Sequence, residues 1–360
     1  MQTKRSNSME FSSKKMKKTV FIADIAANHD GSLQKAIDLV HEVAEAGANA
    51  VKFQHFTAST LISREAFEAI GKISHQEAWA DPVDKVYQKY SLPYDWSNSL
   101  LKEANKANVD LMTTPYNFEA VGRLSPYVSA FKIGSGDITY IDLIARVVEE
   151  NKYTYLATGA SNLNEVIRAV DILKRCKAGH CIMQCNTNYS GSIENFKYIS
   201  LRVISLYKRL FPQADVGLSD HTPGHTTALG AIALGATAVE KHFTLDNTLN
   251  GPDHQFSMTP NTWKEMVDRA RELELAMGSS EDKVVEENEK ESIVVQRRAL
   301  VVNKSLPVGH ILNSEDIEIL RPCPQGAFEA YSKLDLIGKR LLEPKTCGSH
   351  LYPSDIDVNI

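Results

Sequence analysis

The feature that most constrains the fold is a unit repeated through most of the chain. Each copy has a short apolar run rich in β-branched residues, a polar cluster and an amphipathic stretch of helical periodicity. The first run is TVFIADIAANHD (residues 19–30), after which Gly31-Ser32 precedes an apolar stripe that ends at Gly47. Seven further runs occupy residues 48–54, 109–115, 130–137, 153–160, 180–189, 214–221 and 237–243.

Strands that alternate with helices predict a parallel sheet with right-handed crossovers. Eight such units close most simply as a (β/α)8 TIM barrel of the α/β class, with an open doubly wound sheet as the alternative. Each strand changes from apolar to polar residues at its carboxyl end, so we expect the functional site there. The stretch 57–96 is longer than a usual loop and helix, and part of it is expected to form a lid or an interface element.

A chain of 360 residues is longer than most single domains built around one hydrophobic core, so a second, smaller domain is expected. We predict a flexible basic tail over residues 1–18 and a catalytic barrel over residues 19–280. The charged run EDKVVEENEKE predicts a linker or solvated helix over residues 281–292. A small β-rich domain should occupy residues 293–360, with strands in IVVQRRALVV, IEILRP and LIGKRLL.

Composition limits the partners and the compartment. The net charge of -5 is small, and no basic stripe with interleaved aromatic residues occurs, so nucleic acid is not an expected partner. The sequence contains no run of about eighteen apolar residues, so no membrane-spanning helix is expected. The basic start lacks the apolar stretch of a signal peptide, and the five cysteines show no CxxC spacing. A cytoplasmic location is therefore expected.

Two histidines end neighbouring predicted strands, His221 in GLSDH and His242 in VEKH. Neutral imidazoles that converge from adjacent strand ends can share one divalent ion and leave its other positions open. A lone histidine is more often structural, but each of these stands near a carboxylate, Asp220 or Glu240. The pattern predicts a metal site with His221 and His242 as ligands.

Lysines and hydroxyl groups follow other strands. Lys52 in VKFQ and Lys132 in FKIGSGD lie where a buried ammonium group needs a counter-charge, which predicts a phosphorylated, carboxylated ligand. Further donors for that anion are the glycine-rich GSGD backbone and the hydroxyl groups of Thr114, Ser135, Thr187, Tyr189 and Ser219.

Three carboxylates complete the candidate site. Asp24 and Glu240 are candidates for a general base or a water-positioning group, because nearby cations would keep both ionised. Asp253 follows the Gly-Pro turn of GPDH, which would direct it toward the barrel mouth, although an aspartate there can also simply stabilise the turn.

From about residue 19 to residue 357 the chain resembles the sialic acid synthase family, the nonulosonate synthases. The matching segments are, in order, IADIAANHDG, AVKFQ, TTPY, FKIGSGD, ATGA, CNTNY, GLSDHTPG, EKHFT and GPDH. The part from about Ile293 is similar to the antifreeze-like (SAF) domain, a β-clip fold. The resemblance implies a metal-dependent transferase that joins phosphoenolpyruvate to an open-chain 2-acetamido-hexose of the N-acetylmannosamine type.

The resemblance also implies residue roles. An ion, most commonly manganese with magnesium or cobalt as alternatives, would be held by His221 and His242 and would polarise the sugar aldehyde. Phosphoenolpyruvate then attacks, water adds, and phosphate leaves by C–O cleavage. The implied catalytic residues are Asp24, Glu240 and His242. Phosphoenolpyruvate would be bound by Lys52, Thr114, Lys132, Ser135, Thr187, Tyr189 and Ser219. The sugar would be met by Asp24, Asp253 and Arg321, the last from the partner subunit of a domain-swapped homodimer.

Some positions depart from the family pattern. Asp24 and Ala26 stand where Glu and Gly are usual, and the shorter carboxylate leaves the sugar specificity open. The retained GPDH favours a sialic or legionaminic type of substrate over the pseudaminic type. Two other functions remain as alternatives. One is a Schiff-base pyruvate aldolase that uses Lys132 or Lys241. The other is a catalytically silent sugar-binding relative that has lost turnover because Asp24 replaces the usual Glu.

Overall fold

The computed structural model describes residues 18–71, 76–77, 79, 81–278 and 282–357. The chain forms two compact units that divide between Ser279 and Ser280. The tail predicted for residues 1–18 lies, except for Lys18, outside the described residues. No helix in the described ranges has the length and apolar character needed to cross a bilayer.

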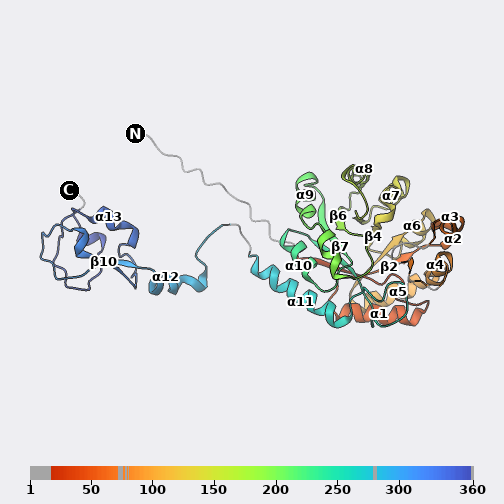
Figure 1. Ribbon diagram of the computed structural model, residues 1–360, viewed down its shortest axis with the longest axis horizontal. Coiled ribbons are helices and arrows are strands. Elements are labelled where there is room, and N and C mark those ends of the chain that lie inside the picture. Colours follow the sequence, from red (N-terminus) through yellow and green to blue (C-terminus); the bar gives the residue numbers. More distant parts are fainter. Residues whose placement is uncertain (1–17, 72–75, 78, 80, 279–281, 358–360) are drawn as a thin grey trace. The chain divides into compact units, whose positions relative to one another are not determined.

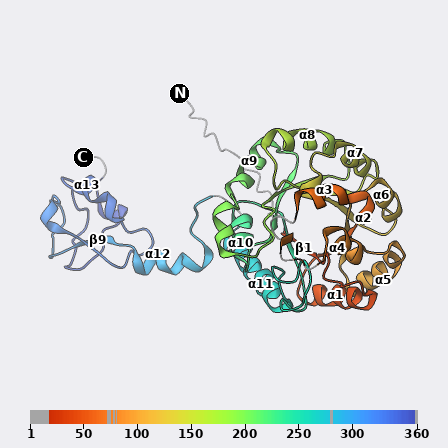
Figure 2. The ribbon, with the colours of Figure 1, turned by 45° about the vertical axis from the view of Figure 1, so that its right-hand side comes forward.

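Eight parallel strands close the first unit into a barrel (Figures 1 and 2). Each strand pairs with the next along the chain, and β1 pairs with β8 to complete the ring. The predicted barrel is confirmed, and the doubly wound alternative is wrong. The strands are β1 (Val20–Asp24), β2 (Ala50–His55), β3 (Asp110–Pro115), β4 (Ala130–Ile133), β5 (Tyr153–Ala157), β6 (His180–Cys185), β7 (Asp215–Asp220) and β8 (Ala238–His242).

An outer ring of helices covers the strands (Figure 2). Local signals start these helices: the Ser32 side chain accepts a hydrogen bond from the Lys35 amide to cap α1, and Asn162 forms a capping box with Glu165 to start α8. Their apolar faces pack against the strands as the main core. The helices are α1 (Leu33–Glu45), α5 (Ser97–Ala107), α6 (Phe118–Leu124), α7 (Ile141–Glu149), α8 (Leu163–Leu173), α9 (Arg202–Leu210), α10 (Thr226–Ala233) and α11 (Pro260–Ala276).

The barrel interior changes from apolar to polar along each strand. A separate apolar cluster inside the ring includes Ile22, Ala50, Met112, Ala130 and Ala238. Side chains on a strand alternate between its two faces, so the residue two places further on also points inward. Those next inward positions hold Asp24, Lys52, Thr114, Lys132 and Glu240, all buried. The alternation therefore places a layer of four charged groups and one hydroxyl group directly above the apolar cluster inside the ring.

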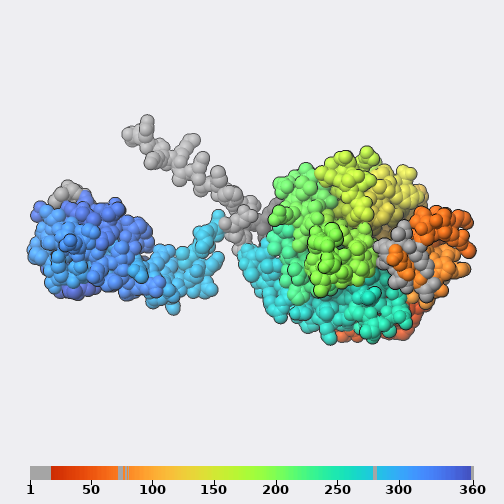
Figure 3. All heavy atoms as spheres, in the orientation of Figure 1, coloured from red at the N-terminus to blue at the C-terminus, as the bar shows by residue number. Residues whose placement is uncertain are grey.

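The stretch between β2 and α5 folds into short helices. These are α2 (Ala58–Leu61), α3 (Arg64–Ile70) and α4 (Val83–Tyr90), followed by a 3-10 turn at Tyr94–Trp96. In Figure 2 they lie inside the ring of outer helices, and in Figure 3 this orange segment forms a raised part of the barrel surface. We call residues 57–96 the β2–α5 insertion.

The second unit contains α12 (Lys290–Gln296), an antiparallel pair of strands β9 (Ala299–Val302) and β10 (Ile317–Leu320), and the short helix α13 (Lys333–Leu336). The expected small β-rich unit is confirmed, but two of its predicted strands differ. The first half of IVVQRRALVV is helical, because a capping box at Glu286 and Glu289 starts a helical turn that α12 continues. LIGKRLL forms isolated bridges instead of a strand.

Candidate active site

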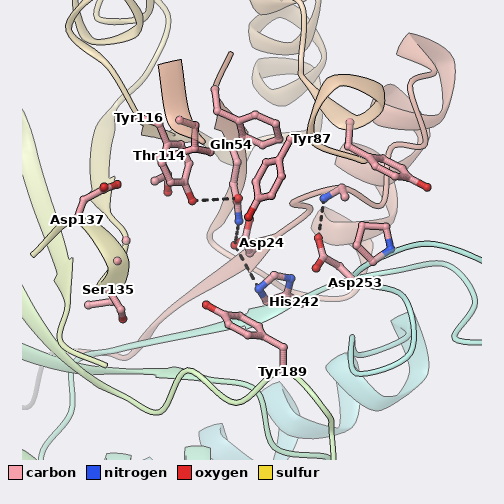
Figure 4. A pocket seen from close by; sticks show the side chains of 18 of the residues that line it. Asp24, Gln54, Tyr87, Thr114, Tyr116, Ser135, Asp137, Tyr189, His242 and Asp253 are labelled. Atoms are coloured by element: carbon pink, nitrogen blue, oxygen red, sulfur yellow. Dashed lines mark hydrogen bonds and ion pairs between the residues drawn. The ribbon is translucent and has the colours of Figure 1, made fainter. Parts of the chain in front are cut away.

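A cavity of about 450 Å³ opens at the carboxyl ends of the barrel strands (Figure 4). The β2–α5 insertion and the loops after β3, β4, β6 and β8 form its sides. The structure brings eleven of the predicted site residues together in its lining: Asp24, Lys52, Thr114, Lys132, Ser135, Tyr189, Ser219, His221, Glu240, His242 and Asp253.

The cavity floor is a network of buried charges. The Lys52 Nζ lies 2.7 Å from Asp24 Oδ2, 3.1 Å from Thr114 Oγ1 and 3.8 Å from Glu240 Oε1. The Lys132 Nζ lies 2.5 Å from the same Glu240 oxygen. Two ammonium groups thus face two carboxylates, which makes the floor formally neutral and satisfies the requirement that buried charges be paired.

The lysines keep both carboxylates ionised. Burial alone would raise the pKa of Asp24, but the charges of Lys52 and His242 and the hydrogen bonds from Lys52 and Gln54 together lower that pKa to about 2. Burial likewise opposes ionisation of Glu240, and the charges of Lys132 and Lys52 reverse the effect, so the pKa of Glu240 is lowered. Burial would lower the pKa of Lys52, but Asp24 and Glu240 raise it. At neutral pH these carboxylates are therefore bases and hydrogen-bond acceptors.

The two predicted metal ligands face each other beside this floor. The ring centroids of His221 and His242 are 5.3 Å apart. The His221 Nδ1 lies 2.9 Å from the Asn186 carbonyl oxygen, and the tautomer that donates this hydrogen bond leaves Nε2 with a lone pair. The His242 Nε2 lies 3.6 Å from Asp24 Oδ2, and its buried Nδ1 has no hydrogen-bond partner.

The chemistry of this pair fits a divalent ion. Burial lowers the pKa of His242 to about 3, so its imidazole is neutral and able to act as a ligand. Burial also opposes protonation of His221, but the Cys185 thiol raises its pKa, so a metal would compete with a proton there. Within the described residues no group of three or more His, Cys, Asp or Glu side chains is arranged as a metal site. An ion would therefore take its remaining ligands from water or substrate.

Asp253 occupies the opposite side of the cavity from Asp137 (Figure 4). Its Oδ2 accepts a hydrogen bond of 3.0 Å from the Ala27 amide, and burial raises its pKa to about 6. The neighbouring His254 anchors this loop, because its Nδ1 lies 2.6 Å from Thr244 Oγ1 and its Nε2 lies 3.2 Å from Asp30 Oδ1. The GPDH turn is thus fixed from both sides and presents its carboxylate to the cavity.

Residues 39–282 match the sequence profile of the NeuB family, and residues 297–357 match that of the SAF domain. The chain belongs to the NeuB family. This confirms the resemblance to the sialic acid synthase family in the sequence, and the SAF domain occupies the second unit.

NeuB-family relatives match along most of the chain. An N,N'-diacetyllegionaminic acid synthase from Campylobacter jejuni is 34% identical over 85% of this chain and 91% of its own length. A pseudaminic acid synthase from the same species is 29% identical over 94% of this chain and 97% of its own. The crystal structure of an N-acetylneuraminic acid synthetase from Leptospira borgpetersenii superimposes with a TM-score of 0.66 at 26% identity, covering 77% of this chain and 90% of that one.

Two predicted site residues lie outside the cavity lining. Thr187 is half-buried and its methyl group faces Gly159. Arg321 lies in the second unit, directly after β10, where it is exposed to solvent. Their predicted roles in binding phosphoenolpyruvate and sugar stay predictions.

Several lining residues were missed from the sequence. Gln54 donates to Asp24 Oδ2 at 2.9 Å and accepts from the Tyr116 hydroxyl at 3.2 Å. Its position two residues after Lys52 on one strand is a signal that could have identified it. Asp137 ends the GSGD segment, and burial raises its pKa to about 6. The Cys185 thiol also lines the cavity; burial would raise its pKa, but a hydrogen bond with His221 lowers it.

Proposed function

We propose that this chain is a nonulosonic acid synthase that condenses phosphoenolpyruvate with an open-chain 2-acetamido-hexose of the N-acetylmannosamine type. The new bond joins C3 of phosphoenolpyruvate to the aldehyde carbon of the sugar. Water adds at C2, the bond between C2 and the phosphate oxygen breaks, and inorganic phosphate leaves. Membership of the NeuB family and the names of the relatives support this reaction class.

The observation that carries the proposal is that two buried lysines and two buried imidazoles line the same cavity. Lys52 and Lys132 would bind the carboxylate and phosphate of phosphoenolpyruvate, since buried ammonium groups attract anions strongly in a low-dielectric site. Thr114, Ser135 and Ser219 line the same cavity, and their hydroxyl groups would donate to the phosphate oxygens, Ser219 in place of its hydrogen bond to Glu240 Oε1.

We propose that His221 and His242 hold a divalent ion, most readily Mn²⁺, with Mg²⁺ or Co²⁺ as alternatives. Such an ion supplies Lewis acidity to the aldehyde oxygen and makes its carbon more electrophilic. The charge of the floor also favours an added cation. The two lysines are already neutralised by Asp24 and Glu240, so an anionic substrate needs further positive charge beside them.

The carboxylates take the remaining roles in this proposal. Asp24 Oδ2 is held by Lys52 and Gln54 and faces His242, so it would orient the sugar aldehyde or the attacking water. Glu240 Oε2 is buried and has no hydrogen-bond partner, which leaves it free to accept the proton of that water. Asp253 would accept a hydrogen bond from a sugar hydroxyl.

The test is phosphate release from phosphoenolpyruvate in the presence of Mn²⁺ and a panel of 2-acetamido sugars. We expect phosphate and a product heavier than the sugar by the pyruvate unit, seen by mass spectrometry. In ¹⁸O-labelled water the label should enter the sugar acid and not the phosphate, because the C–O bond is cleaved. Label in phosphate, or binding of both substrates without turnover, would contradict the proposal; the latter result would favour a silent sugar-binding relative.

The Schiff-base alternative requires a free lysine amine. Lys132 makes a buried ion pair with Glu240, and Lys241 makes one with Asp220 at 2.5 Å. Nucleophilic attack by either would first break that pair and leave a buried carboxylate unpaired, which is costly. Borohydride treatment with pyruvate should therefore leave both lysines unmodified; trapping at either would support the aldolase.

We also propose a cytoplasmic, domain-swapped homodimer in which Arg321 reaches the sugar site of the partner subunit. Co-expression of an Arg321→Ala chain with a His242→Ala chain tests the exchange. In a swapped heterodimer one site combines an intact barrel with an intact Arg321, so activity returns. Without the exchange every site carries one lesion, and no activity returns.

A further inference from the structure

A buried ion pair lies behind the two histidines of the cavity. Asp220 ends β7, Lys241 is the last residue but one of β8, and the two are register partners in the parallel sheet. Side chains alternate along a strand, so both point out of the barrel, whereas the residues that follow them, His221 and His242, line the cavity. The Lys241 Nζ lies 2.5 Å from Asp220 Oδ2, and the side chains are 1% and 0% exposed.

Lys241 holds the chain on both sides of His221. Besides its ion pair with Asp220, its Nζ donates a hydrogen bond of 2.6 Å to the Thr222 carbonyl oxygen. Asp220 and Thr222 are the residues directly before and after His221, which itself lies one residue beyond the last register pair of β7 and β8. The lysine that precedes one imidazole therefore fixes the backbone that carries the other.

Asp220 is held as firmly as Lys241. Its Oδ2 accepts hydrogen bonds from the Thr222 hydroxyl at 2.8 Å and the Thr227 hydroxyl at 2.6 Å. Its Oδ1 accepts from the Thr222 amide at 3.2 Å, and both threonines are buried. The carboxylate thus joins the end of β7 to the start of α10, and Lys241 joins both to β8. We call Asp220, Lys241 and the Thr222 carbonyl group the strand clamp.

Stability alone does not account for the strand clamp. Replacement of a buried ion pair by apolar side chains of similar volume is often neutral or stabilising, because both charges lose their water on burial. What the pair adds is direction, since hydrogen bonds from an ammonium group fix the distance and angle of its acceptors. Ring centroids of the two imidazoles are 5.3 Å apart, and groups that orient metal ligands strongly affect metal affinity.

We infer, on the basis of the proposed function, that Lys241 is a positioning residue for the metal site. It sets the separation of His221 and His242 by holding both flanks of His221 from the strand that carries His242. It touches neither the ion nor the substrate. Loss of the strand clamp therefore lowers the affinity for the ion, while the binding of phosphoenolpyruvate at Lys52 and Lys132 is retained.

The test compares dissociation constants for Mn²⁺, measured on the full chain from the electron paramagnetic resonance signal of free Mn²⁺. Lys241→Met combined with Asp220→Asn removes both charges together, and the asparagine keeps an acceptor for the Thr222 amide. This double variant should bind Mn²⁺ about tenfold to a hundredfold more weakly. The KM for phosphoenolpyruvate at saturating Mn²⁺ should stay unchanged, and a cooperative melting curve shows that the variant folds.

Two further variants separate positioning from general stability. Lys241→Gln combined with Asp220→Asn places two neutral amides that can keep a hydrogen bond between the strands, so part of the Mn²⁺ affinity should return. Tyr153→Phe is the control, because it removes a hydrogen bond of 2.6 Å to Asp215 at the opposite end of β7. Its dissociation constant for Mn²⁺ should equal that of the wild type.

Hydrogen–deuterium exchange of the wild type gives a result whether or not the variants fold. The Thr222 amide donates to Asp220, so its exchange reports on the strand clamp. If the clamp positions His221 before an ion binds, Mn²⁺ should slow exchange at Thr222 by no larger a factor than at Leu218 in the core of β7. A larger factor at Thr222 would mean that the ion itself orders this segment, and the inference would be overturned.

A double variant that folds and binds Mn²⁺ with the wild-type dissociation constant would also overturn this inference, and it would leave the proposed function standing. A wild type that binds no Mn²⁺ would overturn the proposed metal site and this inference with it.

Discussion

Replacement of Asp253 by asparagine should stabilise the barrel at neutral pH while it impairs catalysis. Burial raises the pKa of Asp253 to about 6, from an ordinary value of 3.8. Between these two values the folded state holds a proton that the unfolded state has lost. The free energy of unfolding therefore falls as pH rises through this window. Asparagine keeps an oxygen that can accept from the Ala27 amide and carries no charge to bury.

The magnitude follows from the two pKa values. They differ by about 2.2, and at about 1.4 kcal/mol per pKa unit the ionised carboxylate costs about 3 kcal/mol once both states are deprotonated. About half of this cost is present near pH 5 and nearly all of it near pH 7.5, so the advantage of the variant should grow by about 1.4 kcal/mol over that range. Burying the amide group of the asparagine also costs free energy, so these values are upper limits for the stabilisation of the variant.

Intrinsic fluorescence is a suitable assay because the three tryptophans, Trp79, Trp96 and Trp263, all lie in the barrel unit. Its melting curve therefore reports on barrel unfolding in the full chain. A stabilisation of about 3 kcal/mol should raise the melting temperature by roughly 6 to 12 °C at about pH 7.5, and by about half as much near pH 5.

Asp81→Asn serves as a surface control, since Asp81 is exposed. Its melting temperature should follow that of the wild type at each pH. The opposite result is a melting temperature of Asp253→Asn that changes with pH between about 5 and 7.5 just as that of the wild type does. The carboxylate would then not carry the buried charge that the geometry implies, and the reasoning would be refuted.

Other perturbations test the charged floor and its neighbours. His242→Ala, or exhaustive chelation, should lower phosphate release by more than about a hundredfold, and Mn²⁺ should restore only the chelated wild type. Lys132→Met should raise the KM for phosphoenolpyruvate and, because Glu240 is left buried without its partner, cost about 3 to 5 kcal/mol of stability in urea unfolding. Asp24→Glu should change the order of preference among acceptor sugars; an unchanged order would contradict the contact of this residue with substrate. Gly159→Ala would place a Cβ 2.5 Å from Thr187 Cγ2, so overpacking should cost about 1 to 3 kcal/mol in the same unfolding assay.

The barrel was predictable because its rules are local and repeated. Lys52 and Lys132 were predicted as site residues because a charged group at a buried strand end needs a counter-charge, and Glu240 because nearby cations would keep it ionised. Period-two alternation places all three inside the ring. The same rule applies to Gln54, which was missed because an uncharged amide gives no sign of needing a buried partner. Asp24 and His242 meet only because β1 pairs with β8, which barrel closure imposes.

Elements that depend on tertiary packing were less predictable. Residues 293–296 were predicted as the start of a strand because of their valines, yet they belong to the helix α12, where Val294 and Val295 are exposed. The β2–α5 insertion was recognised as unusual by its length. Which of its apolar residues would join a core and which would border the cavity depends on how α2, α3 and α4 pack, and periodicity over helices of four to eight residues is too short to decide it.

The separation between floor and insertion has a consequence for how such an enzyme diverges. The floor residues share one hydrogen-bonded charge network, so a change at Lys52 or Glu240 leaves another buried ion unpaired. Leu61 and Phe67 have no such dependence, since they are half-buried and belong to no apolar cluster among the described residues. Substitution there changes the lining of the cavity at little cost in stability, because few contacts are lost. If the proposed function holds, selection for a new acceptor can therefore act on the insertion, while the residues proposed for carbon–carbon bond formation stay at the strand ends.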